Sequence, residues 1–308
     1  MRWTVALVIG MGGLGWAGGA DRHVLAPYTK ATNIAHRGAS ADAPEHTLTA
    51  YRLAIKHGAD FVEPDLQITK DGVLICLHDT SLERTTDVRR VFPDRGREVN
   101  GKTTWPVADF TLDEIRRLDA GSWKGAPFVG AKVPTFQEMI DEVRGKAGII
   151  PETKAPEVYG RVGLDMEKLL MAALVKNGLD QPGGDPKTPV MIQSFSAESL
   201  RMLRAEHRCK LPLVFLVGGR QAADQVSAEG LKRVKEFADG IAPNKAVVLE
   251  RPAMVADAHA LGMSVTVWTF SSRQTGKFPD VRAEMAHFLR DLKVDAVFTD
   301  NPDQFPRD

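Results

Sequence analysis

Short runs rich in Val, Ile and Phe alternate with helical patterns along most of this chain, and no other sequence feature constrains the fold as strongly. Because strands separated by helices return in the same direction, the alternation predicts βαβ units and a parallel sheet. Eight such runs lie at 33–36, 60–65, 148–152, 189–194, 212–217, 240–242, 264–269 and 295–299. Eight strands with interleaved helices predict a TIM-type (β/α)8 barrel. A chain of 308 residues with 43% hydrophobic content can bury a core of that size.

The helical patterns between the runs have the 3.6-residue period of amphipathic helices. They cover 47–57, 135–143, 164–176, 197–205, 228–237, 253–261 and 281–292. An open, doubly wound α/β sheet is the alternative architecture. No strand of this chain ends in the glycine-rich turn that binds dinucleotides in such sheets, so the barrel is favoured.

The amino terminus has the features of an export signal. Arg2 precedes an apolar, glycine-rich run at 3–16, and the small residues Gly18 and Ala20 fit a signal-peptidase site before Asp21. The run is shorter than the roughly 20 apolar residues of a membrane-spanning helix, and no cysteine follows it to accept a lipid. We therefore predict a signal peptide at 1–20, a mature domain at 21–308, a periplasmic or secreted location and no stable membrane insertion. An uncleaved anchor is the alternative.

The charges of the chain balance, with 40 Lys and Arg against 40 Asp and Glu. No overall field attracts nucleic acid, so any anion site must be local. The two cysteines, Cys76 and Cys209, are too few for a disulfide framework or a zinc cluster, and we expect buried core thiols, with one bridge as the alternative. No pattern in the sequence specifies an oligomeric state.

One strand is expected to continue into a hairpin. The run at 60–65 extends to Asp71 and Gly72, and a second alternating run follows at 73–79. Asp-Gly between alternating runs is a strong signal for a two-residue turn. A two-residue turn would place Lys70 opposite Val73 and His78 opposite Asp65.

Two carboxylates on that strand indicate a cation. Glu63 and Asp65 are two residues apart, so their side chains point to the same side of the strand. Carboxylates this close repel each other unless a cation lies between them, and a hard divalent ion with oxygen ligands, Ca²⁺ or Mg²⁺, suits them. The alternative is that both are ordinary strand-end residues paired with lysines.

Ionisable groups also follow the first and third strands, as His36 and Arg37 and as Glu152 and Lys154. Because the carboxyl ends of barrel strands meet at one mouth, we expect seven ionisable residues to converge there. They are His36, Arg37, Glu63, Asp65, His78, Glu152 and Lys154. The carboxylates would hold a metal, the two cations would bind phosphate oxygens, and the two imidazoles would serve as acid and base near neutral pH.

The motifs around these residues resemble a known family. They read Ile-Ala-His-Arg-Gly-Ala-Ser at 34–40, Pro-Glu-His-Thr at 44–47, Glu-Pro-Asp at 63–65, His-Asp at 78–79 and Thr-Asp-Asn-Pro at 299–302. Together they are similar to the glycerophosphodiester phosphodiesterase family, in particular its periplasmic bacterial branch. The resemblance covers essentially the whole mature chain.

The resemblance implies a barrel with a small inserted subdomain and a small-molecule substrate. It implies hydrolysis of deacylated phospholipids, such as glycerophosphocholine or glycerophosphoethanolamine, to glycerol 3-phosphate and an alcohol. It assigns a divalent metal, for which we favour Ca²⁺ over Mg²⁺, to Glu63, Asp65 and Glu152, and catalysis to His36 and His78. Arg37 and Lys154 would bind the phosphate.

The segment 80–133 does not follow the alternation of strands and helices seen in the rest of the chain. We therefore predict an inserted cap subdomain there, with one short helix near 112–118. We expect this cap to lie over the mouth and to help select the alcohol. Phe128, Phe195 and Trp268 are candidates to line the substrate pocket, with core packing as the alternative for each. Trp268 could stack on a quaternary ammonium group.

Two further residues are expected to support the site without binding metal. We expect His46 to be a hydrogen-bonded loop or helix-capping residue, and Asp79 to orient the neighbouring loop or its histidine. Three other functions remain open. A sphingomyelinase D-like enzyme would need an exposed apolar entrance, a phosphoinositide phospholipase C would carry other motifs, and a non-catalytic phosphate-binding protein would not need two imidazoles.

Overall fold

A strongly curled sheet of parallel strands forms the centre of the molecule, which we describe from a computed structural model covering residues 28, 30–99 and 101–307. All eight predicted strands are present. They are β1 (Thr32–His36), β2 (Phe61–Glu63) with β3 (Asp65–Ile68), β7 (Gly148–Ile149) with β8 (Glu152–Thr153), β9 (Ile192–Ser194), β10 (Leu213–Val217), β11 (Gly240–Pro243), β12 (Ser264–Phe270) and β13 (Ala296–Thr299). The predicted TIM-type barrel is confirmed.

Two strands of the barrel are each built from two halves. β2 pairs with β1 and β7, whereas β3, the continuation of β2 beyond Pro64, pairs with β8. Proline has no N–H to donate, so the strand is interrupted at this residue. The carbonyl of Pro64 still accepts a hydrogen bond from the Glu152 N–H at 2.9 Å, which keeps the two broken strands in register.

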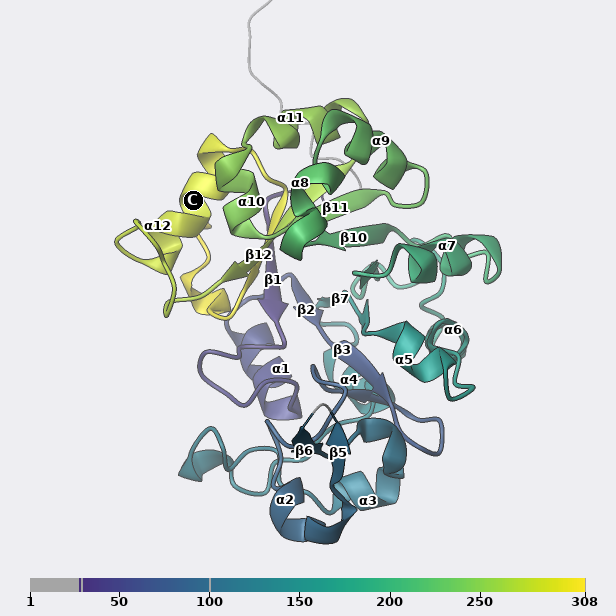
Figure 1. Ribbon diagram of the computed structural model, residues 1–308. Helices are drawn as coiled ribbons and strands as arrows, with labels where there is room; N and C mark the ends of the chain where they lie inside the picture. Colours follow the sequence, from purple (N-terminus) through teal and green to yellow (C-terminus); the bar gives the residue numbers. More distant parts are fainter. Residues whose placement is uncertain (1–27, 29, 100, 308) are drawn as a thin grey trace, which may run out of the picture.

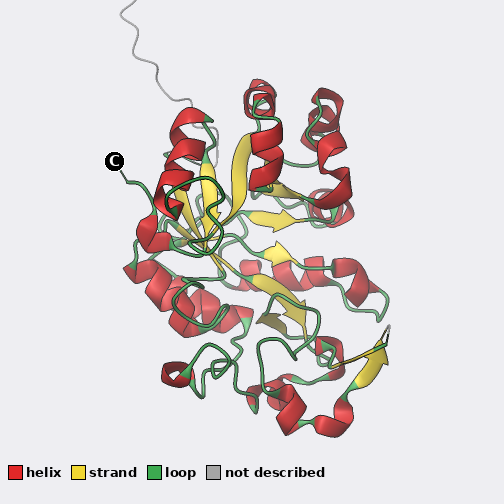
Figure 2. Ribbon diagram, turned by 60° about the vertical axis from the view of Figure 1, so that its left-hand side comes forward, coloured by secondary structure: helices red, strands yellow, loops and turns green. Residues whose placement is uncertain are grey.

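Helices surround the strands, as Figure 2 shows. The predicted helices are α1 (Leu48–Lys56), α4 (Phe136–Val143), α6 (Met166–Lys176), α7 (Ala197–Ala205), α9 (Ala228–Lys235), α11 (Ala253–Ala260) and α12 (Val281–Ala286), which continues as a π-helical turn (His287–Asp291). Short helices α5 (Pro156–Gly160), α8 (Ala222–Gln225) and α10 (Lys245–Glu250) were not expected. Hydroxyl side chains cap the amino-terminal ends of several helices. Those of Thr47, Thr135 and Ser196 accept hydrogen bonds from backbone N–H groups in the first turns of α1, α4 and α7.

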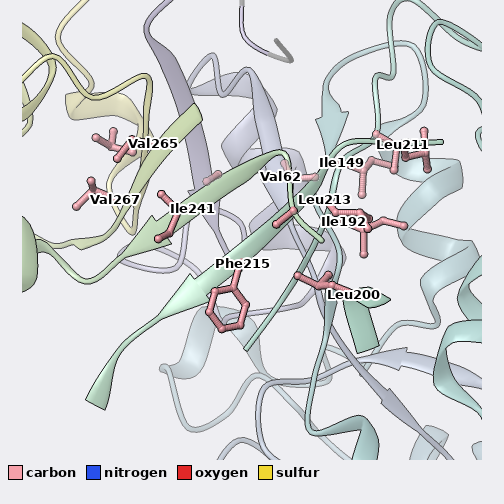
Figure 3. Packing of buried hydrophobic residues seen from close by; sticks show 14 of the residues in the cluster. Val62, Ile149, Ile192, Leu200, Leu211, Leu213, Phe215, Ile241, Val265 and Val267 are labelled. Atoms are coloured by element: carbon pink, nitrogen blue, oxygen red, sulfur yellow. The ribbon is translucent and has the colours of Figure 1, made fainter. Parts of the chain in front are cut away.

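Side-chain alternation divides the core into two layers. Outward residues such as Val62, Ile192 and Leu213 join one large cluster with helix residues, including Leu200 of α7 (Figure 3). Inward residues such as Ile34 and Phe61 fill the barrel interior. Because side chains point inward at every second residue, the row from Ile34 continues to His36 and the row from Phe61 continues to Glu63. The packed interior thus positions polar side chains at the carboxyl ends of the strands.

The hairpin differs from its predicted register by one residue. β4 (Leu74–Cys76) pairs antiparallel with β3, and Leu66 lies opposite Cys76. Asp65 therefore faces Leu77, whose N–H donates to the Asp65 carbonyl at 3.0 Å, and not His78 as predicted. The turn contains three residues, because Gly72 adopts a φ of +79° and allows the bulged three-residue loop in place of the two-residue turn.

The segment 80–133 forms a small inserted unit with its own core, seen at the lower end of Figure 1. It contains α2 (Val88–Val91), the antiparallel pair β5 (Arg97–Val99) and β6 (Lys102–Thr104), and α3 (Leu112–Arg116), which confirms the predicted short helix. Its apolar cluster includes Leu82, Trp105 and Phe110 and is distinct from the two barrel clusters. This cluster also includes Ile75 and Leu77 of the hairpin, so apolar contacts with the hairpin help to stabilise the insert.

The predicted signal peptide at 1–20 lies outside the described residues. In the part of the chain that the structure describes, no helix has the length and hydropathy to cross a membrane. Cys76 and Cys209 are both free and buried, as expected for core thiols.

Candidate active site

A cavity of about 210 Å³ opens at the carboxyl ends of the barrel strands. We call it the barrel cavity. All seven ionisable residues predicted to converge at the mouth line it, together with Phe195 and Trp268. The remaining lining residues are Gln193, Leu216, Thr269 and Phe298. The structure therefore brings together side chains that are as far apart in the sequence as His36 and Trp268.

Three buried carboxylates form the deepest charged group of the cavity. Glu63, Asp65 and Glu152 are each at most 3% exposed, and each offers an oxygen within 4.8 Å of the others. The backbone explains this proximity: Asp65 and Glu152 are directly paired on β3 and β8, and Glu63 precedes Asp65 by one pleat. The Asp65 Oδ1 atom has no hydrogen-bond partner among the described residues. Lys154 Nζ lies 3.6 Å from this oxygen, beyond hydrogen-bond distance. An all-oxygen donor set with a buried oxygen that lacks a hydrogen bond fits a hard divalent cation.

The pKa shifts of these three carboxylates also favour a bound divalent cation. Burial, and after it the charge of Asp65, raise the pKa of Glu63 above its ordinary value and the pKa of Glu152 well above it. Burial also opposes ionisation of Asp65, but Lys154, His46 and Arg37 hold the pKa of Asp65 well below its ordinary value. Without a bound cation the three groups therefore resist simultaneous ionisation, and a divalent ion would relieve that cost.

Neighbouring donors hold the carboxylates in place. The backbone N–H of Arg37 donates to Glu63 Oε2 at 2.8 Å, and Gln193 Nε2 donates to Glu63 Oε1 at 3.1 Å. His46 Nε2 lies 2.9 Å from Asp65 Oδ2, and its Nδ1 lies 2.9 Å from the Tyr51 hydroxyl. His46 does not line the barrel cavity and supports a carboxylate from behind, which agrees with the role expected for it.

The His36 ring is oriented by an aspartate that the sequence analysis did not single out. His36 Nδ1 lies 2.7 Å from Asp300 Oδ1, and the Ser40 hydroxyl donates to the same oxygen at 3.0 Å. Burial opposes ionisation of Asp300, but the hydrogen bonds from His36 and neighbouring hydroxyls keep its pKa below the ordinary value. Asp300 directly follows the last strand as His36 ends the first, so the strand-end rule could have placed Asp300 at the mouth, but not identified the group that it binds.

The His78 ring is oriented in a similar way. Its Nδ1 lies 2.6 Å from Asp79 Oδ1, the contact expected for Asp79. Burial opposes ionisation of Asp79, but the hydrogen bonds from His78 and Arg84 outweigh it and lower the pKa of Asp79 to about 2. In both histidines a carboxylate holds Nδ1, so Nε2 is the ring atom left for chemistry in the cavity.

Two cations complete the cavity. Arg37 Nη1 donates to Glu45 Oε1 at 2.9 Å, and its Nε lies 3.3 Å from Asp65 Oδ2. Lys154 Nζ lies 3.1 Å from Glu152 Oε1. Burial disfavours both charges, yet the surrounding carboxylates raise the pKa of Arg37 and of Lys154 above their ordinary values. Both side chains are therefore cationic at neutral pH and can bind an anion at the mouth.

An aromatic pair forms the outer wall. The rings of Phe195 and Trp268 meet edge to face with centroids 5.6 Å apart, and Trp268 Nε1 donates to the Ala242 carbonyl at 2.8 Å. Phe195 remains 45% exposed although it lines the cavity. Both residues thus occupy the positions expected of them.

The insert lies beside the barrel cavity, and none of its described residues in 80–133 lines it. The expectation that Phe128 lines the pocket is wrong. Phe128 belongs to a compact loop that folds around Asp119, whose carboxylate accepts N–H groups of Gly121, Ser122 and Gly130. This loop contacts the barrel through Lys124, whose Nζ donates to the Ser40 carbonyl.

Replacing Asp300 with asparagine is expected to lower kcat about 10-fold or more, because the His36 ring loses the charge that orients it. The depressed pKa of Asp300 also means that the ionised carboxylate adds stability above its unfolded-state pKa, and that this stability is lost as pH falls through the acidic range. Steady-state kinetics and thermal unfolding between pH 3 and 8 test both statements. Unchanged kcat in the variant would contradict the orienting role.

Comparisons with known proteins find relatives that are similar over most of this chain. Residues 36–304 match the sequence profile of the Glycerophosphoryl diester phosphodiesterase family. A glycerophosphodiester phosphodiesterase of Bacillus subtilis (strain 168) is 38% identical over 280 residues, covering 88% of this chain and 84% of that protein. A probable glycerophosphodiester phosphodiesterase 1 of Mycobacterium tuberculosis is 30% identical over 277 residues, covering 87% and 89%.

Solved structures show a similar fold. A phosphodiesterase of Oleispira antarctica, in complex with the product sn-glycerol-3-phosphate, superimposes with a TM-score of 0.70 at 23% identity, covering 89% of this chain and 95% of the other. A glycerophosphodiester phosphodiesterase of Agrobacterium tumefaciens gives a TM-score of 0.63 at 26% identity, covering 89% and 98%.

Proposed function

Because this chain belongs to the glycerophosphoryl diester phosphodiesterase family and is an enzyme of that class, we propose that it hydrolyses glycerophosphodiesters to glycerol 3-phosphate and a free alcohol. The observation that carries the proposal is the barrel cavity, in which two aspartate-held imidazoles accompany three buried carboxylates and two cations. The glycerol 3-phosphate bound as product in the Oleispira antarctica protein supports the same assignment. Membership of the periplasmic branch stays a prediction.

Glu63, Asp65 and Glu152 would hold a divalent cation, which when bound would withdraw charge from the phosphate during P–O cleavage. We favour Ca²⁺ because it accepts several protein carboxylates in a flexible shell, whereas Mg²⁺ usually binds through one or two carboxylates and keeps several waters. Arg37 and Lys154 would contact the remaining phosphate oxygens, since both border the carboxylates and line the same cavity.

The two imidazoles supply the proton transfers. One Nε2 removes the proton from the nucleophile, which is water or the neighbouring glycerol hydroxyl, as its oxygen bonds to phosphorus. The bond from phosphorus to the alcohol oxygen breaks, and the other imidazole protonates the departing alkoxide. If the glycerol hydroxyl attacks first, water then opens the cyclic phosphate with the same two groups in exchanged roles.

The walls of the cavity favour a small polar substrate over an acylated lipid. Among the described residues, Phe195 is the one exposed large apolar side chain that lines the cavity. A sphingomyelinase D-like enzyme would need a broader apolar entrance for its acyl chains. A cavity of about 210 Å³ instead suits a glycerophosphoryl group.

The test is product analysis with the purified mature chain. We expect glycerol 3-phosphate and choline from glycerophosphocholine, loss of both products with a chelator, and recovery on addition of Ca²⁺. Sphingomyelin and lysophosphatidylcholine should yield no product. Release of phosphocholine, or the absence of glycerol 3-phosphate from glycerophosphocholine, glycerophosphoethanolamine and glycerophosphoinositol alike, would refute the proposal.

Export of the protein is a separate proposal, supported by the apolar run at 3–16 and the small residues before Asp21. Expression of the full-length chain in a bacterial host should yield a periplasmic or secreted protein. Amino-terminal sequencing should begin at or near Asp21. Recovery of the protein in the cytoplasm with residues 1–20 intact would contradict the proposal.

A further inference from the structure

Arg84, in the first turn of the insert, bridges two carboxylates through its guanidinium group. Its Nη1 donates to Glu45 Oε2 at 2.9 Å, and its Nη2 donates to Glu45 Oε1 at 2.7 Å. Its Nε donates to Asp79 Oδ2 at 2.5 Å. Three donors of one planar group are thus engaged in two charge-assisted contacts.

Each of these carboxylates also holds a residue of the barrel cavity. The other Asp79 oxygen, Oδ1, binds His78 Nδ1 at 2.6 Å. Glu45 Oε1 also accepts from Arg37 Nη1 at 2.9 Å. Arg84 therefore connects the proposed acid/base His78 and the proposed phosphate ligand Arg37, although it does not itself line the cavity.

The geometry makes the bridge difficult to replace. Glu45 and Asp79 lie at different positions in the sequence, one after the first strand and one after the hairpin, and no backbone element joins them directly. A guanidinium presents fixed donors to both carboxylates at once, whereas a lysine ammonium is a point charge on a flexible stem. Without Arg84, the Asp79 carboxylate loses its second anchor and the side chain can rotate together with the imidazole bound to it.

We propose that Arg84 is a positioning residue that holds His78 through Asp79 and Arg37 through Glu45, and thereby makes the insert a structural part of the active site. The proposal rests on the proposed function, because it concerns residues assigned there to phosphodiester cleavage. It also gives the insert a role that does not require its residues to enter the cavity. Small displacements of a catalytic group lower the rate strongly, so loss of the bridge should reduce kcat.

A purely structural ion pair is the competing interpretation. Arg84 has a side chain that is 42% exposed, and exposed ion pairs contribute little to stability. Arg95 is a matched control in the same insert: its side chain is 39% exposed, and its Nη1 donates to Glu114 Oε1 at 2.6 Å. Among the described residues, neither Arg95 nor Glu114 contacts a residue that lines the barrel cavity.

The experiment compares Arg84→Met with Arg95→Met, using glycerophosphocholine hydrolysis in the presence of Ca²⁺ and thermal unfolding. For Arg84→Met we expect kcat to fall about 10- to 100-fold, as is typical when a group that orients an active-site residue is removed. The melting temperature should fall no further than in Arg95→Met, whose kcat should stay within about two-fold of wild type. Arg84→Lys should lose most of the same kcat, because it cannot bridge both carboxylates.

Chemical rescue separates positioning from folding. Guanidinium ion at millimolar concentration should restore part of the kcat of Arg84→Ala and leave the kcat of the Arg95→Ala control unchanged. Wild-type kcat in Arg84→Met would overturn the inference, and so would an equal loss in Arg95→Met or a loss that tracks the melting temperature and resists guanidinium.

The wild-type enzyme distinguishes this inference from the proposed function. If wild type releases no glycerol 3-phosphate, the proposed function fails, and the His78 imidazole signals in ¹⁵N NMR then test the bridge without activity. A change of the His78 signals in Arg84→Met but not in Arg95→Met would support the bridge, and identical spectra in all three proteins would overturn it.

Discussion

Substitution of Glu152 by glutamine should abolish most of the activity, with kcat lower by about 10³-fold or more, since charge stabilisation by a metal is worth several kcal/mol and each 1.4 kcal/mol is tenfold. Glutamine keeps the volume of the side chain but removes one of the three charges that would hold the cation. Glu152 is paired with Asp65 on the neighbouring strand, and among the described residues no fourth carboxylate lines the cavity.

A binding measurement makes this prediction independent of turnover. Ca²⁺ should raise the melting temperature of the wild-type protein, because a ligand that binds only the folded state stabilises it by about 2.7 kcal/mol at 100 times its Kd. The shift should be much smaller in Glu152→Gln. Glu167→Gln is the control, since Glu167 is a buried carboxylate of α6 that does not line the barrel cavity. A Ca²⁺ shift and a kcat equal to those of wild type in Glu152→Gln would show that the three carboxylates do not bind the metal.

Removal of either imidazole is the second large effect. His36→Ala and His78→Ala should each lower kcat by about 10²- to 10⁴-fold, the usual contribution of a positioned general acid or base. Each histidine lines the cavity, and each has its Nδ1 held by an aspartate, so alanine removes a preoriented proton-transfer group. KM should change much less than kcat, because Arg37 and Lys154 remain to bind the phosphate.

The control for these variants is another aspartate-paired histidine of the barrel. His259 belongs to the last turn of α11, and its Nε2 lies 2.9 Å from Oδ2 of Asp295, the residue before β13. His259 does not line the cavity. His259→Ala should therefore keep a kcat close to that of wild type even if it loses some stability. Near-normal kcat in either His36→Ala or His78→Ala would remove that histidine from the mechanism.

The site residues at the strand ends could be predicted from the sequence because their placement depends on local patterns. Alternation of side chains along a strand places Glu63 and Asp65 on one side, and the rule that carboxyl ends of barrel strands share a mouth brings His36 and Glu152 to them. Both inferences follow from the two-residue alternation of side chains along a strand and from the fold class. All four residues line the cavity.

The register of the hairpin could not be predicted from the sequence with the same precision. An Asp-Gly pair signals a turn, but the choice between a two- and a three-residue loop depends on contacts outside the hairpin. Here Lys70 donates its N–H to the Phe110 carbonyl, and the Leu112 N–H donates to Asp71. These contacts come from the insert, which the hairpin sequence does not specify, and they favour the longer loop.

The sequence by itself determined the order of strands and helices, the (β/α)8 closure and the residue types at the mouth, because periodicity and strand-end chemistry act over a few neighbouring positions. Only the tertiary structure decided which partner orients each group: Asp300 for His36, His46 behind Asp65, and Arg84 between Asp79 and Glu45. These partners are separated from one another by up to 264 positions, and such contacts depend on how whole elements pack, which no local pattern encodes.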